Sequence, residues 1–236
     1  MNSVFNGKVI ENTPFENVYI SHSPSDVGNS IGAALYVAHN LKNEDRDTTF
    51  NSSYLGPSFS DEEIKKTLER RKIIYKKVEN IPKTVADILS RGEIIARFDG
   101  RMEFGERALG NRSILADPRA KNIKDKINSI IKYRESYRPF APVVTQEKVC
   151  NYFEVSENFT CNYMEKVVQI KKDFHNELPA VTHIDGSGRV QTVNEKHNQS
   201  FYQIIKEFEL LTGLPIVLNT SFNIAGEPVV LSPDDA

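Results

Sequence analysis

The chain has 236 residues, a net charge of −2, 39% hydrophobic residues and 26% charged residues. This composition is typical of a globular protein and suffices for one large or two small domains. We expect no signal peptide, because no apolar run follows Met1. We expect no membrane span either, because no segment approaches the ~20 apolar residues that a membrane helix needs. Cys150 and Cys161 lack metal-ligand spacing, which argues against a zinc site and favours reduced thiols in a cytoplasmic protein.

The first part of the chain predicts three helices and one short strand. Residues 17–20 predict the strand, and the small residues that follow Asp26 predict a helix with Asp26 at its N-cap. Ser60 and Glu63 form a capping-box pattern, which predicts a helix from there to about residue 78. Residues 84–90 predict a further helix that Gly92 ends.

The middle of the chain predicts a strand, a loop and a helix. Residues 93–98 predict a short buried strand, and a Gly- and Arg-rich loop follows at residues 101–113. Asp117 and Pro118 predict the start of a helix with a buried isoleucine face. Lys132 and Arg134 fall in the last turn of that helix, where they would also interact favourably with the helix dipole.

The last part predicts strands at residues 163–170 and 180–184, a helix at residues 200–211 and a strand at residues 215–219. In the helix, Phe201, Ile204, Ile205 and Phe208 share the face expected to pack in the core. Residues 232–236 have the pattern of a helix start. We therefore expect the chain to be a piece of a longer protein.

Positive charge is concentrated in one region. Residues 97–138 contain eleven Lys and Arg residues and six Asp and Glu residues. Glycines allow backbone N–H groups to approach an anion, and guanidinium groups bind phosphate in a bidentate manner. Arg101, Arg107, Arg112 and Arg138 are therefore candidate ligands of an anionic substrate. The alternative is a solvated loop whose arginines pair with nearby glutamates.

Two further segments carry candidate residues. Arg189, which lies beside Gly186 and Gly188, is a candidate phosphate ligand. His183 is a candidate for substrate orientation or proton transfer, or else a structural residue. Ser221 and Asn223 follow the predicted strand 215–219, where polar groups suit ligand binding in an α/β domain. Aromatic residues among the basic ones keep RNA binding as an alternative, although no long basic run is present.

Three segments together resemble the carbamoyltransferases of the nodulation-protein-U type. They are residues 100–144, residues 182–193 (THIDGSGRVQTV) and residues 218–230 (LNTSFNIAGEPVV). The resemblance covers nearly the whole chain. It implies an α+β fold with a YrdC-like carboxyl-terminal domain, preceded by the last elements of an actin/hexokinase/Hsp70-type α/β domain. It also implies catalytic roles for Lys132 and Arg134, and for Ser221 and Asn223, as Lys-x-Arg and Ser-x-Asn elements.

The resemblance further implies an O-carbamoyltransferase fragment that activates carbamoyl phosphate with ATP as carbamoyl adenylate, for transfer to a hydroxyl of a small acceptor. We expect residues 1–60 to end the acceptor domain, residues 61–84 to connect, and residues 85–236 to form the YrdC-like domain, truncated at its end. The implied cofactors are ATP with Mg²⁺, and Fe²⁺ or another divalent metal in the complete protein, with Asp26 as one ligand. The alternative function is a non-catalytic nucleotide- or RNA-binding module, with nucleic acid the less favoured partner.

Overall fold

The computed structural model describes residues 2–45 and 52–236. Residues 46–51, in the predicted segment 1–60, lie outside the described residues. The chain is a mixed α and β protein, which agrees with the predicted α+β class at this level. Its elements in chain order are α1 (Ser3–Asn12), α2 (Val27–Tyr36), η1 (Val37–Leu41), α3 (Asp61–Arg70), α4 (Ile81–Ser90), β1 (Ile95–Phe98), β2 (Arg112–Ala116), α5 (Ile123–Ile130), β3 (Ala141–Thr145), η2 (Gln146–Lys148), α6 (Val149–Tyr152), β4 (Val167–Gln169), η3 (Lys172–Phe174), β5 (Ser187–Arg189), β6 (Gln191–Val193), α7 (Gln199–Thr212) and β7 (Ile216–Ser221).

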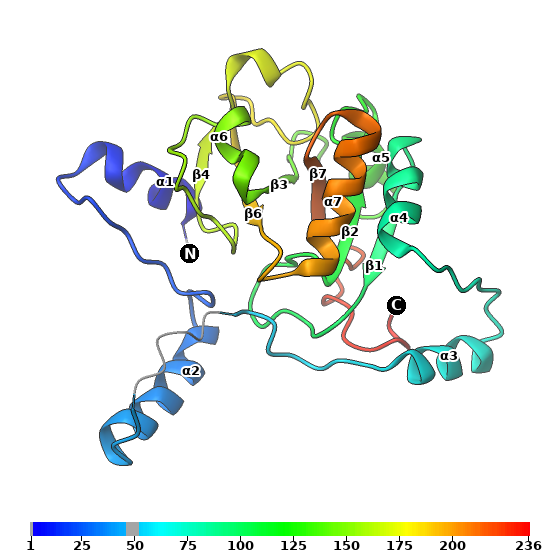
Figure 1. The fold of residues 1–236 in the computed structure, drawn as a ribbon, viewed down its shortest axis with the longest axis horizontal. Coiled ribbons are helices and arrows are strands. Elements are labelled where there is room, and N and C mark those ends of the chain that lie inside the picture. The colour runs from blue at the N-terminus through cyan, green and yellow to red at the C-terminus, as the bar shows by residue number, and fades with distance from the viewer. Residues whose placement is uncertain (1, 46–51) are drawn as a thin grey trace.

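A five-stranded sheet forms the centre of the fold, with the strand order β1-β2-β7-β3-β6. Its neighbours pair antiparallel except for β3 and β6, which are parallel. A second sheet contains β4 and β5, and α1 packs against β4. Helices α4 and α7 pack against each other beside the main sheet, whereas α2 extends away from it (Figure 1).

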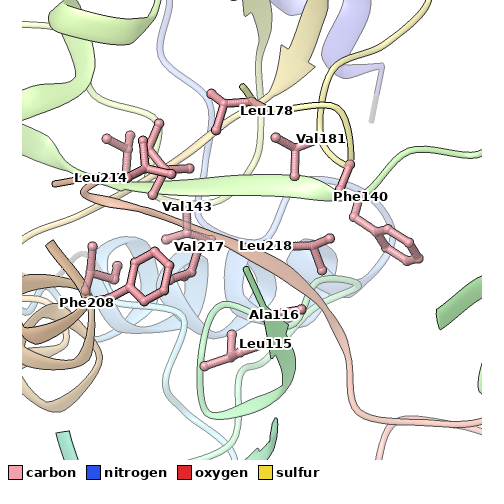
Figure 2. Packing of buried hydrophobic residues seen from close by; sticks show 14 of the residues in the cluster. Leu115, Ala116, Phe140, Val143, Leu178, Val181, Phe208, Leu214, Val217 and Leu218 are labelled. Atoms are coloured by element: carbon pink, nitrogen blue, oxygen red, sulfur yellow. The ribbon is translucent and has the colours of Figure 1, made fainter. Parts of the chain in front are cut away.

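The core lies between the main sheet and these helices. Strands β2 and β3 are buried along their whole length, as are the first four residues of β7. Figure 2 shows Val143, Val217 and Phe208 packed together from β3, β7 and α7. Fully burying one such side chain contributes roughly 1.5–3 kcal/mol. The buried face of α7 consists of Phe201, Ile204, Ile205 and Phe208, as the sequence predicts.

Local signals account for several helix ends. The capping box at the start of α3 is present, with Ser60 and Glu63 bonded to each other's backbone N–H. However, α3 ends at Arg70 rather than near residue 78, and Lys72 follows with a positive φ of 56°. Helix α7 ends at Gly213, whose φ of 76° favours glycine.

Four predictions of secondary structure are wrong. Asp117 does not cap a helix, because its carboxylate accepts hydrogen bonds from the backbone and guanidinium of Arg119, and α5 begins six residues later. The apolar residues before Asp117 belong to the buried strand β2, whose first two residues fall within the predicted loop 101–113. Residues 17–20 and 180–184 are irregular rather than strands.

Among the described residues, no helix is long and apolar enough to cross a bilayer.

Candidate active site

The sheet and α5 bring the Lys-x-Arg and Ser-x-Asn elements together. Lys132 lies just beyond α5, and Ser221 is the last residue of β7. The ammonium Nζ of Lys132 donates to Oγ (3.1 Å) and the carbonyl oxygen (2.6 Å) of Ser221. It also donates to Oδ1 (2.7 Å) and the carbonyl oxygen (2.9 Å) of Asn223. These contacts fix a buried cation at the end of β7.

The environment of Lys132 opposes its charge. Burial, together with the nearby guanidinium of Arg134, lowers the pKa of Lys132 to about 8. Oxygen acceptors around Nζ favour the charged form, but none of the four that accept its hydrogen bonds is a carboxylate. An anion bound beside Lys132 would therefore stabilise its charge.

Arg134 is oriented by a buried asparagine on α5. Its Nε donates to Oδ1 of Asn128 at 2.7 Å, and its guanidinium lies over the ring of Phe140 at 4.8 Å from the centroid. Asn128 also donates to the carbonyl oxygen of Arg138 at 3.1 Å. The sequence analysis missed Asn128, although it is a polar residue next to the buried Ile127 in a helix with an apolar face.

Three arginines from separate segments line one pocket. It has an empty volume of about 480 Å³, which includes space open to solvent, and Arg107, Arg134 and Arg189 contribute to its wall together with Ser221 and Thr220. Within the described part of the chain, the Nε atoms of Arg107 and Arg189 are buried and have no hydrogen-bond partner. Burial and the guanidinium groups of Arg107 and Arg134 lower the pKa of Arg189 to about 10. Like charges gathered in one pocket wall attract anions.

A second pocket shares two of these arginines. Arg134 and Arg189 line it together with Arg138 and His183, and its empty volume is about 630 Å³. Arg138 is exposed and pairs with Glu135 at 3.3 Å, so it lies at a solvated rim. Nδ1 of His183 lies 2.9 Å from Oγ of Ser187, and burial lowers the pKa of His183, which favours the neutral imidazole.

Buried amides hold the loop that carries Arg107. Nδ2 of Asn219 donates to the carbonyl oxygen of Ala108 at 3.0 Å, and Nε2 of Gln191 donates to that of Leu109 at 3.0 Å. Oε1 of Glu103 accepts from the backbone N–H groups of Leu109 and Asn111, both at 2.7 Å. The sequence did not reveal the roles of Asn219 and Gln191, because their contacts join residues 111 and 82 positions apart in the chain.

Two predicted ligands lie elsewhere and do not line either pocket. Arg112 is fully buried, lies over the ring of Phe98 at 3.6 Å from the centroid, and donates to the carbonyl oxygens of Asp99 and Asn111. Arg101 is exposed and donates to the carbonyl oxygens of residues 55 and 56. Arg101 and Arg112 thus lie apart from the pocket that Arg107 lines, and among the described residues Nε of Arg112 is buried without a hydrogen-bond partner. A role of either arginine in anion binding stays a prediction.

Asp26 lies at the start of α2, as predicted, but its side chain makes no capping hydrogen bond. It is exposed. The residues described here contain no group of three His, Cys, Asp or Glu side chains that could hold a metal ion. The described residues therefore supply too few ligands to hold a metal ion at Asp26.

The fold brings three arginines into the wall of one pocket, and comparison with known proteins identifies the family of the chain. Residues 86–236 match the family described as "Carbamoyltransferase C-terminus". The chain belongs to this carbamoyltransferase family.

Similar proteins support the assignment. An uncharacterized protein of Methanocaldococcus jannaschii is 42% identical to this chain. The match covers 100% of this chain and 39% of the archaeal protein. Nodulation protein NolO of Bradyrhizobium diazoefficiens is 38% identical, again over 100% of this chain and 44% of its own length. Nodulation protein U of Rhizobium fredii is 32% identical, and the match covers 96% of this chain and 37% of nodulation protein U. The chain thus spans about two fifths of the length of these relatives.

One solved structure overlaps part of the chain. The structure of full-length HypF in its phosphate- and nucleotide-bound form overlaps 68% of this chain and 19% of the HypF chain. The sequence identity is 15% and the TM-score is 0.43. An overlap of this extent does not establish a shared fold.

Proposed function

We propose that this chain is the part of an O-carbamoyltransferase that joins carbamoyl phosphate and ATP as carbamoyl adenylate. The observation that carries the proposal is the meeting of Arg107, Arg134 and Arg189 in one pocket, next to Lys132 and Ser221. By mass balance, the reaction consumes one water and releases phosphate and pyrophosphate. Fixed cations are needed because two polyanions must approach each other and charge develops on the leaving phosphates.

The charges of the pocket support a phosphorylated substrate. Three guanidinium groups face one acidic side chain in the wall, Glu106, whose carboxylate accepts a hydrogen bond from Ser25. The net positive charge would be neutralised by the phosphate of carbamoyl phosphate and by the phosphates of ATP. We assign phosphate binding to the arginines, and the positioning of the reacting groups to Lys132 and the Ser-x-Asn element.

Mg²⁺ fits this site when it arrives on the nucleotide. Mg²⁺ is commonly held by one or two carboxylates together with substrate phosphates, and Glu106 is the carboxylate in the pocket wall. Bound Mg²⁺ would neutralise charge on the phosphates of ATP. Fe²⁺ or another metal at Asp26 would need ligands beyond those of the described residues.

The rest of the proposal concerns the larger protein. We propose that residues 85–236 are YrdC-like and that residues 1–60 end an actin-type domain, with residues 61–84 connecting the two. The carbamoyl group would pass to a hydroxyl of a small acceptor in the cytoplasm. His183 would orient the substrate from the second pocket, where it lies with Arg189.

The test is the exchange of labelled pyrophosphate into ATP. We expect exchange that requires carbamoyl phosphate and needs no acceptor alcohol, because activation precedes transfer. Arg101→Gln is the matched control for arginine variants, since Arg101 lies outside both pockets. A folded protein that binds neither substrate and shows no exchange contradicts the proposal.

A second candidate function is RNA or nucleotide binding without catalysis. Its support is that Tyr133 and Tyr137 are 69% and 63% exposed beside the arginines, where they could stack on bases. RNA binding would fall steeply with salt and would not depend on carbamoyl phosphate. Steep salt dependence together with the absence of exchange would favour this function.

A further inference from the structure

The amide of Asn219 has a fixed orientation at the wall of the arginine pocket. Asn219 lies on β7 and is 1% exposed. Its Nδ2 donates to the carbonyl oxygen of Ala108 and to Oε1 of Gln191, both at 3.0 Å. Gln191 is itself oriented, because its Nε2 donates to the carbonyl oxygen of Leu109. Asn219 and Gln191 thus form an amide relay between the carbonyl oxygens of Ala108 and Leu109. Because a carbonyl oxygen can only accept, these contacts identify which side-chain atom of Asn219 is the nitrogen and which is the oxygen.

The oxygen of the same amide lacks a donor. Among the residues that the structure describes, none donates to Oδ1 of Asn219, although this atom is buried. A buried acceptor without a donor is costly, and a specific one in a native protein calls for an explanation. Asn219 is also part of the wall of the pocket that Arg107, Arg134 and Arg189 line. A ligand of this pocket is one source of such a donor.

We propose that Oδ1 of Asn219 accepts a hydrogen bond from the NH₂ group of the carbamoyl moiety, and so selects carbamoyl phosphate over acyl phosphates. This inference rests on the proposed function. Acetyl phosphate has almost the same shape and phosphate, but its methyl group cannot donate, so the amide oxygen would stay unpaired. Sites that hydrogen-bond a substrate group reject analogues that lack it, because the protein's polar group is left unsatisfied.

The geometry of β7 supports this assignment. Asn219 and Ser221 are two residues apart on a strand, so their side chains lie on the same face. Ser221 contacts Lys132 and lines the same pocket. The three arginines can hold the phosphate while Asn219 and Ser221 face the carbamoyl group. The competing explanation is that Asn219 only holds the backbone of Ala108 in place.

The experiment uses two stable phosphonates that differ in one group. Phosphonoacetamide carries the NH₂ group, and acetonylphosphonate carries a methyl group in its place. We expect the parent protein to bind phosphonoacetamide roughly 10- to 100-fold more tightly, which is the range for one hydrogen bond to a buried polar group. Inorganic phosphate, titrated in parallel, reports the arginine site alone.

Two variants separate recognition from loop positioning. Asn219→Ala should reduce the preference to about one, mainly by weakening phosphonoacetamide. Glu103→Ala is the matched control, because Glu103 holds the same loop through the backbone of Leu109 and Asn111 but does not orient Asn219 and lies outside this pocket. It should weaken all three anions to a similar extent and keep most of the preference. If Asn219→Ala also weakens all three equally, the positional explanation holds and the proposal is overturned.

The parent protein alone also decides between the possible outcomes, even if Asn219→Ala fails to fold. Equal affinity for the two phosphonates, with phosphate still bound, overturns the role of Asn219 and leaves the anion site standing. Binding of none of the three overturns this inference and the proposed function together. Asn219→Ser, which also shortens the side chain, serves as a second variant with the same expected loss of preference.

Discussion

Nζ of Lys132 lies 2.7 Å from Oδ1 of Asn223, although 91 residues separate them in the chain. Asn223 Oδ1 also accepts a hydrogen bond from Oγ of Ser221 at 2.6 Å. The contact joins the segment after α5 to the segment after β7, so the two paired motifs form one cluster. The cluster borders the arginine pocket, because Arg134 and Ser221 belong to its wall.

Replacing Lys132 by Ala should weaken phosphonoacetamide binding by roughly 10- to 100-fold, the range for one charged hydrogen bond. Lys132→Ala also leaves the acceptors at Ser221 and Asn223 without their donor. Isothermal titration gives the affinity, and a thermal melt shows whether the variant remains folded. Unchanged affinity in a folded variant would mean that Lys132 only stabilises the end of α5 and β7.

Affinity for the same ligand should fall as the pH rises through about 8, because Lys132 loses its proton there. Stability should change in the opposite direction. Between pH 8 and the ordinary lysine pKa of 10.5, the unfolded chain binds more protons at this residue than the folded chain does, so the contribution of Lys132 to stability rises with pH. Titrations and denaturant melts at pH 7 to 9.5 check both signs. Lys132→Met should remove both dependences, and their persistence would assign them to another group.

Asn128→Ala should lower phosphate affinity although Asn128 does not line the pocket. The substitution frees Nε of Arg134 from its 2.7 Å hydrogen bond and leaves the guanidinium less well oriented. We expect a loss of roughly 5- to 10-fold, since a typical hydrogen bond contributes about 1 kcal/mol. Asn128→Asp, which keeps an acceptor for Arg134, should retain more affinity than Asn128→Ala. The reverse order would contradict this positioning role.

Arg112→Ala should lower the free energy of unfolding much more than Arg101→Ala does. Both variants, where folded, should bind phosphate as tightly as the parent protein. Arg112 is fully buried in a network of backbone carbonyl groups, so its truncation should cost roughly 2–5 kcal/mol. Arg101 is exposed, and its loss should change the free energy of unfolding by about 0.5 kcal/mol or less. Denaturant unfolding measures both values. Loss of phosphate binding in a folded Arg101→Ala variant would restore the original expectation for this arginine.

Local patterns predicted the elements whose signals are local. The capping box before α3 and the apolar face of α7 need only neighbouring residues, and both are present. Asp117 failed as a helix cap because the same residue type also bonds a following backbone N–H in a turn. Arg112 was assigned to the Gly- and Arg-rich loop because an arginine rarely occupies the interior of a sheet.

Only those residues of the candidate site that belong to a recognisable motif could be predicted from the sequence. Lys132 and Ser221 followed from the resemblance, and their contact is now seen in the structure. Asn219 contacts Gln191 and Ala108, which lie 28 and 111 residues away along the chain. No spacing within a single segment marks such a contact, so the amide relay emerged only from the three-dimensional structure.

Titration of phosphonoacetamide against single arginine variants tests the central claim most directly. Arg107→Gln, Arg134→Gln and Arg189→Gln each remove one guanidinium from the pocket, whereas Arg101→Gln removes one outside it. We predict a roughly 10-fold or greater loss of affinity for each of the three pocket variants, and affinity close to the parent's for Arg101→Gln. Equal affinities across all four folded variants would contradict a carbamoyl phosphate site between these arginines.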